Sequence, residues 1–349
     1  MSDVIVAPET RDLEELARVL ADWLAARLPA ASAVEILNLS YPRGAGQSHE
    51  TILFDAQWQE HGASRGQGYV VRIRPKSFTV YPDDLFVEQY KVMKALAESG
   101  LVRVARPFWF EEDPSLLGNA FFVMERKVGR VPVSIPPYAR EGWLKEATPA
   151  QRRVLWRNAV GQLAAIQRVP LEGLDFLAGP SGERGLEQEW NKFVHFAEWL
   201  QEVEPLPILT AALERLRGLW PENQPEGLVW GDSRIGNMMF DDDFDVVAVM
   251  DWEQPSLGGA LHDLSWFCVI AETMHGPNST YGAPLEGMGS RDETVALWEE
   301  LTGKSAADLG WYEDFSNFKM ACTGIRLSHL RGTPRMDDAA LARRLKVDG

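Results

Sequence analysis

The most informative segment of the sequence is L-V-W-G-D-S-R-I-G-N-M-M-F-D-D-D-F-D-V-V-A-V-M-D-W-E, at residues 228–253. Its apolar runs, separated by turn residues, predict a strand, a loop, a strand, a turn and a strand in that order. Asp232 and Asp251 flank the hairpin, Asn237 follows Asp232 by five residues, and Arg234 lies between these two. Asn237 and Asp251 stand at opposite ends of this hairpin, which can bring both side chains to one rim.

These residue types suit phosphoryl transfer. The reaction needs a carboxylate that accepts a hydroxyl proton, oxygen ligands for Mg²⁺, and cations around the transferred phosphate. Asp232 has the chemistry of the catalytic base, and Arg234 can face the phosphate with its guanidinium group. Asn237 and Asp251 offer the amide oxygen and the carboxylate that Mg²⁺ prefers. We predict catalytic roles for the first pair and metal ligation for the second.

The sequence around this segment predicts two lobes and an α+β fold class. Leucines at helical spacing over residues 13–28 predict a first helix, with Thr10 as its N-cap. Strands are predicted at residues 34–39, 51–58, 69–73, 108–111 and 120–125, with a helix at 83–99 among them. Helices are then predicted at roughly 148–168, 186–202 and 206–219. Residues 1–125 would form a lobe with an antiparallel sheet, and residues 126–349 a mainly helical lobe.

Charge and composition exclude several classes of partner. The formal net charge of −16 disfavours nucleic acids and anionic membrane surfaces. No stretch approaches the roughly 18 apolar residues of a membrane-spanning helix, and the N-terminus lacks the basic and apolar pattern of a signal peptide. Cys268 and Cys322 belong to no CxxC pair. We expect a cytoplasmic protein with neither a nucleic-acid nor a membrane partner.

D-S-R-I-G-N at 232–237, followed by M-D-W-E at 250–253, resembles the catalytic loop and metal segment of the aminoglycoside phosphotransferase family, which is related to the protein kinases. The match is closest to the branch that contains the kinase-like domain of the family-10 acyl-CoA dehydrogenases. The resemblance implies a two-lobed, protein-kinase-like fold. It also implies a Mg²⁺-dependent small-molecule kinase that moves the γ-phosphoryl group of ATP or GTP to a hydroxyl group of a small acceptor.

The resemblance also implies a nucleotide site in the N-terminal lobe. The turn G-A-G-Q-S would cover the phosphates with Gly44, Gly46, Gln47 and Ser48. Arg72 would hold the phosphates, Glu88 would pair with Arg72, and the nucleotide would lie near residues 124–127, where Glu125 would contact it. Strand alternation places Arg72 on the face opposite Val71 and Ile73. Glu88 shares the apolar stripe of its helix, and an inward carboxylate needs a cationic partner.

Three positions depart from the family pattern. Trp230 replaces the usual histidine before Gly-Asp, Arg72 replaces the nucleotide lysine, and Ala260 replaces a common proline. None of these departures removes the predicted base or a predicted metal ligand. Asp263 is similar to the family's buried aspartate that braces the catalytic loop. Trp266, just after it, has the pattern of a core residue.

Two other functions remain open from the sequence. A catalytically weak nucleotide-binding protein is suggested by Trp230 and Arg72. A serine esterase of the G-D-S type would use Ser233 as its nucleophile, but it needs a D-x-x-H motif, and His329 is preceded at that spacing by Arg326. Turn chemistry is the ordinary reason for acids in loops, and it accounts for the acid run at 241–245, which we expect to be a solvated hairpin tip. The acceptor is not specified by the sequence.

Overall fold

The structure is a computed structural model that describes residues 11–42, 50–75, 79–277, 279, 281 and 284–347. The chain forms two compact units, which we describe separately. The first comprises Met1–Thr79 and Ala105–Val128, and the second comprises Val80–Val104 and Gly129–Gly349. The predicted N-terminal lobe includes residues 80–104, whereas contacts group these residues with the second unit. The predicted lobe boundaries therefore remain a proposal.

The first unit is built on a five-stranded antiparallel sheet with the strand order β1-β2-β3-β5-β4. The strands are β1 (Ala31–Ser40), β2 (Glu50–Glu60), β3 (Ala63–Ile73), β4 (Pro107–Glu111) and β5 (Phe121–Glu125). All five predicted strands are present. Strand β3 starts six residues before the prediction because residues 63–68 pair fully with β2, although their exposed side chains carry no apolar alternation. His61 and Gly62 both have positive φ, as a tight two-residue hairpin requires.

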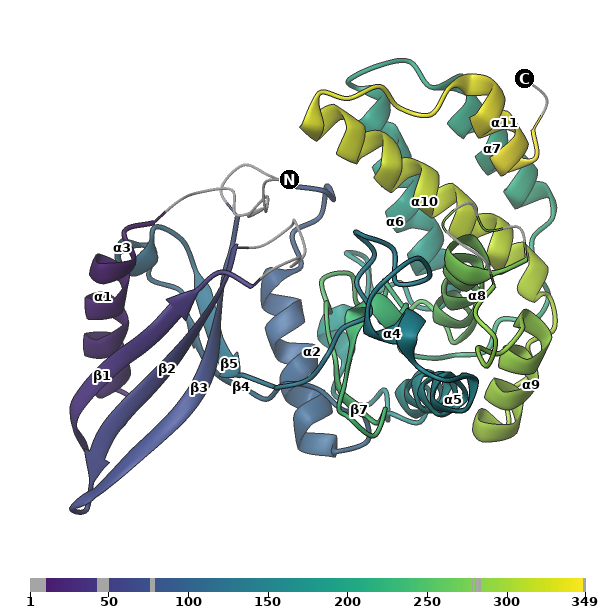
Figure 1. The fold of residues 1–349 in the computed structure, drawn as a ribbon. Coiled ribbons are helices and arrows are strands. Elements are labelled where there is room, and N and C mark those ends of the chain that lie inside the picture. The colour runs from purple at the N-terminus through teal and green to yellow at the C-terminus, as the bar shows by residue number, and fades with distance from the viewer. Residues whose placement is uncertain are drawn as a thin grey trace. The chain divides into compact units, whose positions relative to one another are not determined.

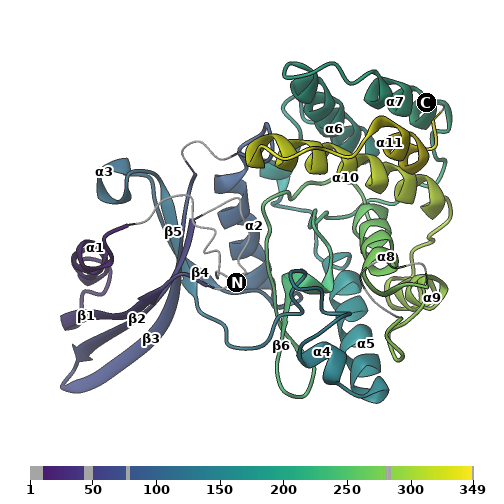
Figure 2. The same cartoon turned by 45° about the horizontal axis from the view of Figure 1, so that its top comes forward.

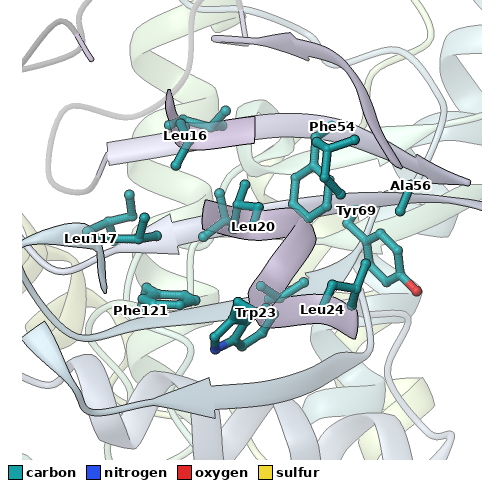
Figure 3. Close-up of a cluster of buried hydrophobic side chains, with 14 of the residues drawn as sticks. Leu16, Leu20, Trp23, Leu24, Phe54, Ala56, Tyr69, Leu117 and Phe121 are labelled. Atoms are coloured by element: carbon teal, nitrogen blue, oxygen red, sulfur yellow. The ribbon is translucent and has the colours of Figure 1, made fainter. Parts of the chain in front are cut away.

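Helix α1 (Leu13–Ala25) packs its apolar stripe on the sheet of the first unit (Figure 1). Figure 3 shows Leu16, Leu20 and Trp23 among sheet residues that include Tyr69 and Phe121. Tyr69, Val71 and Ile73 of β3 belong to this cluster, which confirms the predicted face of the strand. The N-cap is Asp12, whose carboxylate accepts backbone N–H bonds from Glu14 and Glu15. The predicted N-cap, Thr10, lies outside the described residues.

The second unit is mainly helical (Figure 2). Its helices are α2 (Phe86–Ser99), α4 (Trp143–Glu146), α5 (Pro149–Ile166), α6 (Leu186–Gln201), α7 (Pro207–Gly218), α8 (Leu261–His275), α9 (Arg291–Thr302), α10 (Leu309–Arg331) and α11 (Asp338–Leu345). A small hairpin, β6 (Met238–Phe240) and β7 (Val246–Val249), lies among them. The remaining short helices are α3 (Pro114–Leu117) in the first unit and the 3-10 turns η1 (Asp175–Leu177) and η2 (Ile235–Asn237) in the second.

Local chemistry explains two boundaries in the second unit. Thr148 and Gln151 form a reciprocal capping box that starts α5 where the sequence predicts it. The predicted strand at residues 228–230 is wrong, because only Val229 forms a bridge, to Ser256. The following backbone N–H groups bond to a side chain of α8 instead of a neighbouring strand. Among the described residues, no helix combines the length and the apolar character needed to cross a membrane.

Candidate active site

The segment between the bridge at Val229 and η2 is a tight loop. Gly231 adopts φ +103°, which side-chain-bearing residues rarely take. A Cβ atom at this position would lie 2.6 Å from the carbonyl oxygen of Gln254. Any other residue at position 231 would therefore push the loop away from the segment after β7. The loop carries Asp232, Arg234 and Asn237, the first three predicted site residues.

The carboxylate of Asp232 is the centre of the site because three side chains donate hydrogen bonds to it. Its Oδ2 accepts from Asn237 Nδ2 at 2.6 Å and from Arg234 Nε at 3.1 Å. Its Oδ1 accepts from the indole Nε1 of Trp266 at 2.8 Å. The side chain remains 23% exposed, so an outside molecule can still reach it. The structure therefore brings the side chains of Asp232, Arg234 and Asn237 together.

Arg234 is held between two partners. Its Nε donates to Asp232, and its NH1 donates to Ser134 Oγ at 2.9 Å. Burial alone would lower the pKa of Arg234, but the charge and hydrogen bond of Asp232 raise it above its ordinary value, with a smaller contribution from Asp251. The guanidinium is thus fixed as a cation beside the carboxylate.

Asn237 and Asp251 lie at the open end of the β6–β7 hairpin. The backbone N–H of Met250 donates to the carbonyl oxygen of Asn237 at 2.8 Å, which places Asp251 one residue beyond that bond. Asp251 itself has φ +62°, an uncommon backbone conformation for a non-glycine residue. Such backbone strain is often retained where a side chain must be aimed at a functional site.

The donor set at this end of the hairpin fits Mg²⁺. The amide nitrogen of Asn237 bonds to both the side chain and the backbone oxygen of Asp232, so the amide oxygen faces away from these bonds. An amide oxygen and a carboxylate match the preference of Mg²⁺, which keeps several water and phosphate ligands besides one or two protein groups. Within the described ranges, no group of three or more His, Cys, Asp or Glu side chains is arranged to hold a metal ion. A Mg²⁺ site of this kind does not need one.

Asp263 on α8 fixes the backbone of the loop. Its carboxylate accepts the N–H groups of Trp230 at 2.7 Å and Gly231 at 3.0 Å, and its carbonyl oxygen accepts the hydroxyl of Ser233 at 2.6 Å. Burial raises the pKa of Asp263 to about 6, although the two N–H bonds act in the opposite direction. The predicted bracing role of Asp263 is confirmed.

Trp230, at the family's histidine position, is fully buried, and its indole donates to the carbonyl oxygen of Met250 at 2.8 Å. It therefore ties the catalytic loop to the residue before Asp251. The substitution of histidine by tryptophan keeps an N–H donor at this point of the loop.

Comparison with known proteins agrees with this geometry. The model of the family described as "Phosphotransferase enzyme family" matches residues 42–301, which is more than half of the chain. The chain belongs to this family. The family match spans residues 228–253 and four of the five strands of the sheet. Family membership supports a phosphotransfer function for this chain.

The chain is similar to part of two longer proteins that are both named as acyl-CoA dehydrogenases. The probable acyl-CoA dehydrogenase IBR3 of Arabidopsis thaliana is 26% identical over 331 residues, which cover 85% of this chain and 37% of that protein. Human acyl-CoA dehydrogenase family member 11 is 27% identical over 289 residues, which cover 79% of this chain and 35% of that protein. The chain thus spans little more than a third of the length of these curated relatives.

Solved structures share the fold. A Ralstonia eutropha protein that is named among the aminoglycoside phosphotransferases has a TM-score of 0.66 at 24% identity, covering 94% of this chain and 93% of its own. Macrolide 2'-phosphotransferase type I has a TM-score of 0.59 at 15% identity, covering both chains fully. At these identities the similarity concerns the fold alone. It shows the predicted two-lobed, kinase-like α+β fold.

Sequence reasoning missed the contact of Trp266 with Asp232 and the charged surroundings of Tyr81. Trp266 is buried like a core residue, at 8% exposure, yet its indole reaches Asp232. Trp266 follows Asp263 by three residues on the same helix, and this spacing could have indicated that both side chains face the loop. Tyr81 was missed entirely. Its pKa lies well above the ordinary value, first because of burial and then because of the negative charges of Glu253, Asp232 and Asp251.

The predicted nucleotide-binding residues belong to three different parts of the chain. Gly44, Gly46, Gln47 and Ser48 lie outside the described residues. Arg72 is buried on β3 and Glu125 ends β5, both in the first unit, where Glu125 Oε1 pairs with Lys127 at 2.8 Å. Glu88 is half-buried in the first turn of α2, in the second unit. The pairing of Arg72 with Glu88 therefore stays a prediction.

Proposed function

We propose that the chain is a Mg²⁺-dependent kinase that transfers the γ-phosphoryl group of ATP or GTP to a hydroxyl group of a small molecule. The observation that carries this proposal is the carboxylate of Asp232, which two side chains of its own loop and one of α8 hold while part of it stays exposed. Family membership supports phosphoryl transfer in general. The donor, the metal and the residue roles are our inference.

In the proposed reaction, Asp232 accepts the proton of the acceptor hydroxyl while that oxygen forms a bond to the γ-phosphorus. The bond between the γ-phosphorus and the bridging oxygen breaks, and the nucleoside diphosphate leaves with that electron pair. Arg234 lies beside the base as a fixed cation, suited to the charge of the transferred group. Asn237 and Asp251 would hold Mg²⁺, which neutralises phosphate charge when it is bound.

The nucleotide is proposed to bind through the residues that the family resemblance indicates. These are Gly44, Gly46, Gln47, Ser48, Arg72, Glu88 and Glu125. Structures of a relative in fold, the aminoglycoside phosphotransferase APH(4)-Ia, contain ADP or AMP-PNP together with hygromycin B. An adenine nucleotide is therefore the first donor to test, with GTP as the alternative.

The surface beside Arg234 gives one indication of the acceptor. Ser134 holds the guanidinium, and its neighbours Val133 and Ile135 are 39% and 84% exposed. Exposed apolar side chains next to a reacting group favour an acceptor with an apolar portion. The curated relatives are named as acyl-CoA dehydrogenases. Hydroxylated acids and their acyl thioesters therefore belong in the test panel beside aminoglycosides.

The proposal is tested by a screen for Mg²⁺-dependent release of nucleoside diphosphate with ATP and with GTP. Each hit is confirmed by mass spectrometry of the phosphorylated acceptor, and the Asp232→Asn variant serves as the blank for contaminating kinases. Nucleotide binding without transfer to any member of a broad panel would favour the catalytically weak alternative. An esterase activity that is lost in Ser233→Ala would replace the kinase proposal by a hydrolase.

A further inference from the structure

We propose that Trp266 is a positioning residue for the catalytic base, which rests on the proposed function of Asp232. The two oxygens of the Asp232 carboxylate have different partners. Oδ2 is held by Asn237 and Arg234, which belong to the same loop as Asp232. Oδ1 is held by the indole N–H of Trp266, which lies 34 residues away on α8. Of these three bonds, this last one ties the carboxylate to a separate helix.

Such a bond limits rotation of the carboxylate. Donors on one oxygen alone leave the group free to turn about that contact, whereas a donor on each oxygen defines its plane. A carboxylate oxygen has two lone-pair sites, so Oδ1 can accept the indole N–H and still receive a proton. Trp266 therefore orients the base without occupying all of its accepting capacity.

Helix α8 holds the loop at a second point. Asp263, one turn before Trp266, binds the backbone N–H groups of Trp230 and Gly231. Residues three apart on a helix lie on the same face, so α8 presents both anchors to the loop. One anchor fixes the backbone before Asp232, and the other fixes the Asp232 side chain. Together they position the base relative to a rigid helix of the second unit.

A buried lysine side chain lies over the indole ring of Trp266. Lys319 Nζ lies 5.8 Å from the Trp266 ring centroid and pairs with Glu189 at 3.2 Å. Both charged side chains are almost completely buried, at 3% and 2% exposure. Burial alone would raise the pKa of Glu189, but the charges of Lys319 and Lys192 hold it well below its usual range. A fixed cation below the ring restrains the orientation of the indole.

The test is Trp266→Phe, which removes the N–H donor and keeps an aromatic ring. Loss of a hydrogen bond to a charged group predicts a decrease of about tenfold in kcat, with an unchanged KM for the nucleotide. Trp311→Phe is the matched control. Trp311 is also 8% exposed, and its indole donates to the carbonyl oxygen of Leu216 at 2.9 Å. We expect a similar decrease in melting temperature for both variants and a decrease in kcat for Trp266→Phe only.

A double variant separates positioning from general destabilisation. In an Asp232→Asn background, Trp266→Phe should cause no further loss of kcat, because Trp266 acts through the Asp232 carboxylate. Independent losses that multiply would overturn the proposal. Equal losses of kcat in Trp266→Phe and Trp311→Phe would also overturn it.

The contact can be tested without any turnover. In a ¹⁵N-tryptophan-labelled protein, the indole resonance that disappears in Trp266→Phe belongs to Trp266. This resonance should move in Asp232→Ala, whereas the resonance that disappears in Trp311→Phe should not. An unmoved Trp266 signal would overturn the positioning role. A moved signal in a protein that phosphorylates no acceptor would instead count against the proposed kinase function.

Discussion

The two ends of the β6–β7 hairpin carry similar residues and use them differently. At the tip, Asp241 Oδ1 accepts the backbone N–H groups of Asp243 at 3.0 Å and Asp245 at 2.9 Å, while Asp242 is 97% exposed. At the open end, the Asp232 carboxylate binds side chains of its own loop and of α8. Local backbone bonds form the turn at the tip, whereas side-chain donors, one of them from α8, hold the carboxylate at the open end.

The largest difference between the two ends should appear in catalysis. Asp232→Asn removes the proton acceptor but keeps the size of the side chain, so kcat should decrease by about 10²-fold or more, with little change in nucleotide affinity. Asp243→Asn at the tip is the matched control and should leave kcat unchanged. Steady-state kinetics and nucleotide titration check both variants. Near-normal turnover in Asp232→Asn would remove Asp232 from the base role.

Asp263 is a third carboxylate to compare, and its side chain is almost completely buried. Its pKa is about 6 in the folded chain, above the ordinary value of 3.8, so the folded state binds the proton more tightly than the unfolded state. Its contribution to stability is therefore complete below about pH 4 and is lost as the pH rises through about 6. The wild type should have a higher free energy of unfolding than Asp263→Asn at low pH, and this difference should decrease by about 2–3 kcal/mol over this range.

Urea unfolding at a series of pH values, with both proteins measured in the same buffers, checks this trend. Asp242→Asn, which changes a 97% exposed carboxylate at the hairpin tip, is measured alongside as a control for the loss of one negative charge. If the difference in free energy of unfolding between the wild type and Asp263→Asn stays constant or increases as the pH rises, the burial argument is contradicted.

Asp251 should affect metal-dependent binding more than turnover. Replacement by asparagine exchanges an anionic ligand for a neutral amide, which should weaken Mg²⁺-dependent nucleotide binding by about tenfold. Asp242→Asn again serves as the control from the tip. Isothermal titration of nucleotide at several Mg²⁺ concentrations measures the effect. If the dependence on Mg²⁺ is the same in Asp251→Asn as in the wild type, Asp251 is not a metal ligand.

Arg72 and Arg74 form a second pair of like residues in different surroundings. Arg72 is buried within β3, whereas Arg74 lies just past the end of the strand and is only half-buried. Arg72→Ala should raise the nucleotide KM by about tenfold or more, since hydrogen bonds to charged groups contribute about 1.5–3 kcal/mol. It should also lower the melting temperature. Arg74→Ala should do much less, and the reverse order in matched measurements would transfer the phosphate-binding role to Arg74.

The sequence predicted those parts of the molecule in which local pattern and tertiary contact agree. Apolar periodicity identified the five strands and the helices α5, α6 and α7. The spacing of Asp232, Arg234 and Asn237 indicated one site, and the structure brings these three side chains together. The pattern of a charge run likewise predicted the solvated acids at the hairpin tip.

The errors arise where a distant group overrides the local pattern. Residues 228–230 have strand composition, but the Asp263 carboxylate binds the N–H groups of Trp230 and Gly231. The burial of Trp266 was correctly expected, yet a hydrophobic pattern does not specify the direction of an indole N–H. Tyr81 lies in a Pro- and Asp-rich stretch with no periodic signal, so only the folded chain reveals its proximity to the acids.

The smallest expected effect concerns Ser233, the neighbour of Asp232, the proposed catalytic base. Its side chain is fully buried, and its hydroxyl donates to the carbonyl oxygen of Asp263 at 2.6 Å. This geometry is that of a loop brace, whereas a nucleophile needs an accessible hydroxyl beside a base. Ser233→Ala should therefore cost about 1 kcal/mol of stability for one lost hydrogen bond and should change kcat by less than about threefold. Chemical denaturation and steady-state kinetics, run beside Asp232→Asn, measure both quantities. A loss of kcat comparable to that of Asp232→Asn, without unfolding, would show that the serine takes part in the chemistry and that the contrast between these adjacent residues is mistaken.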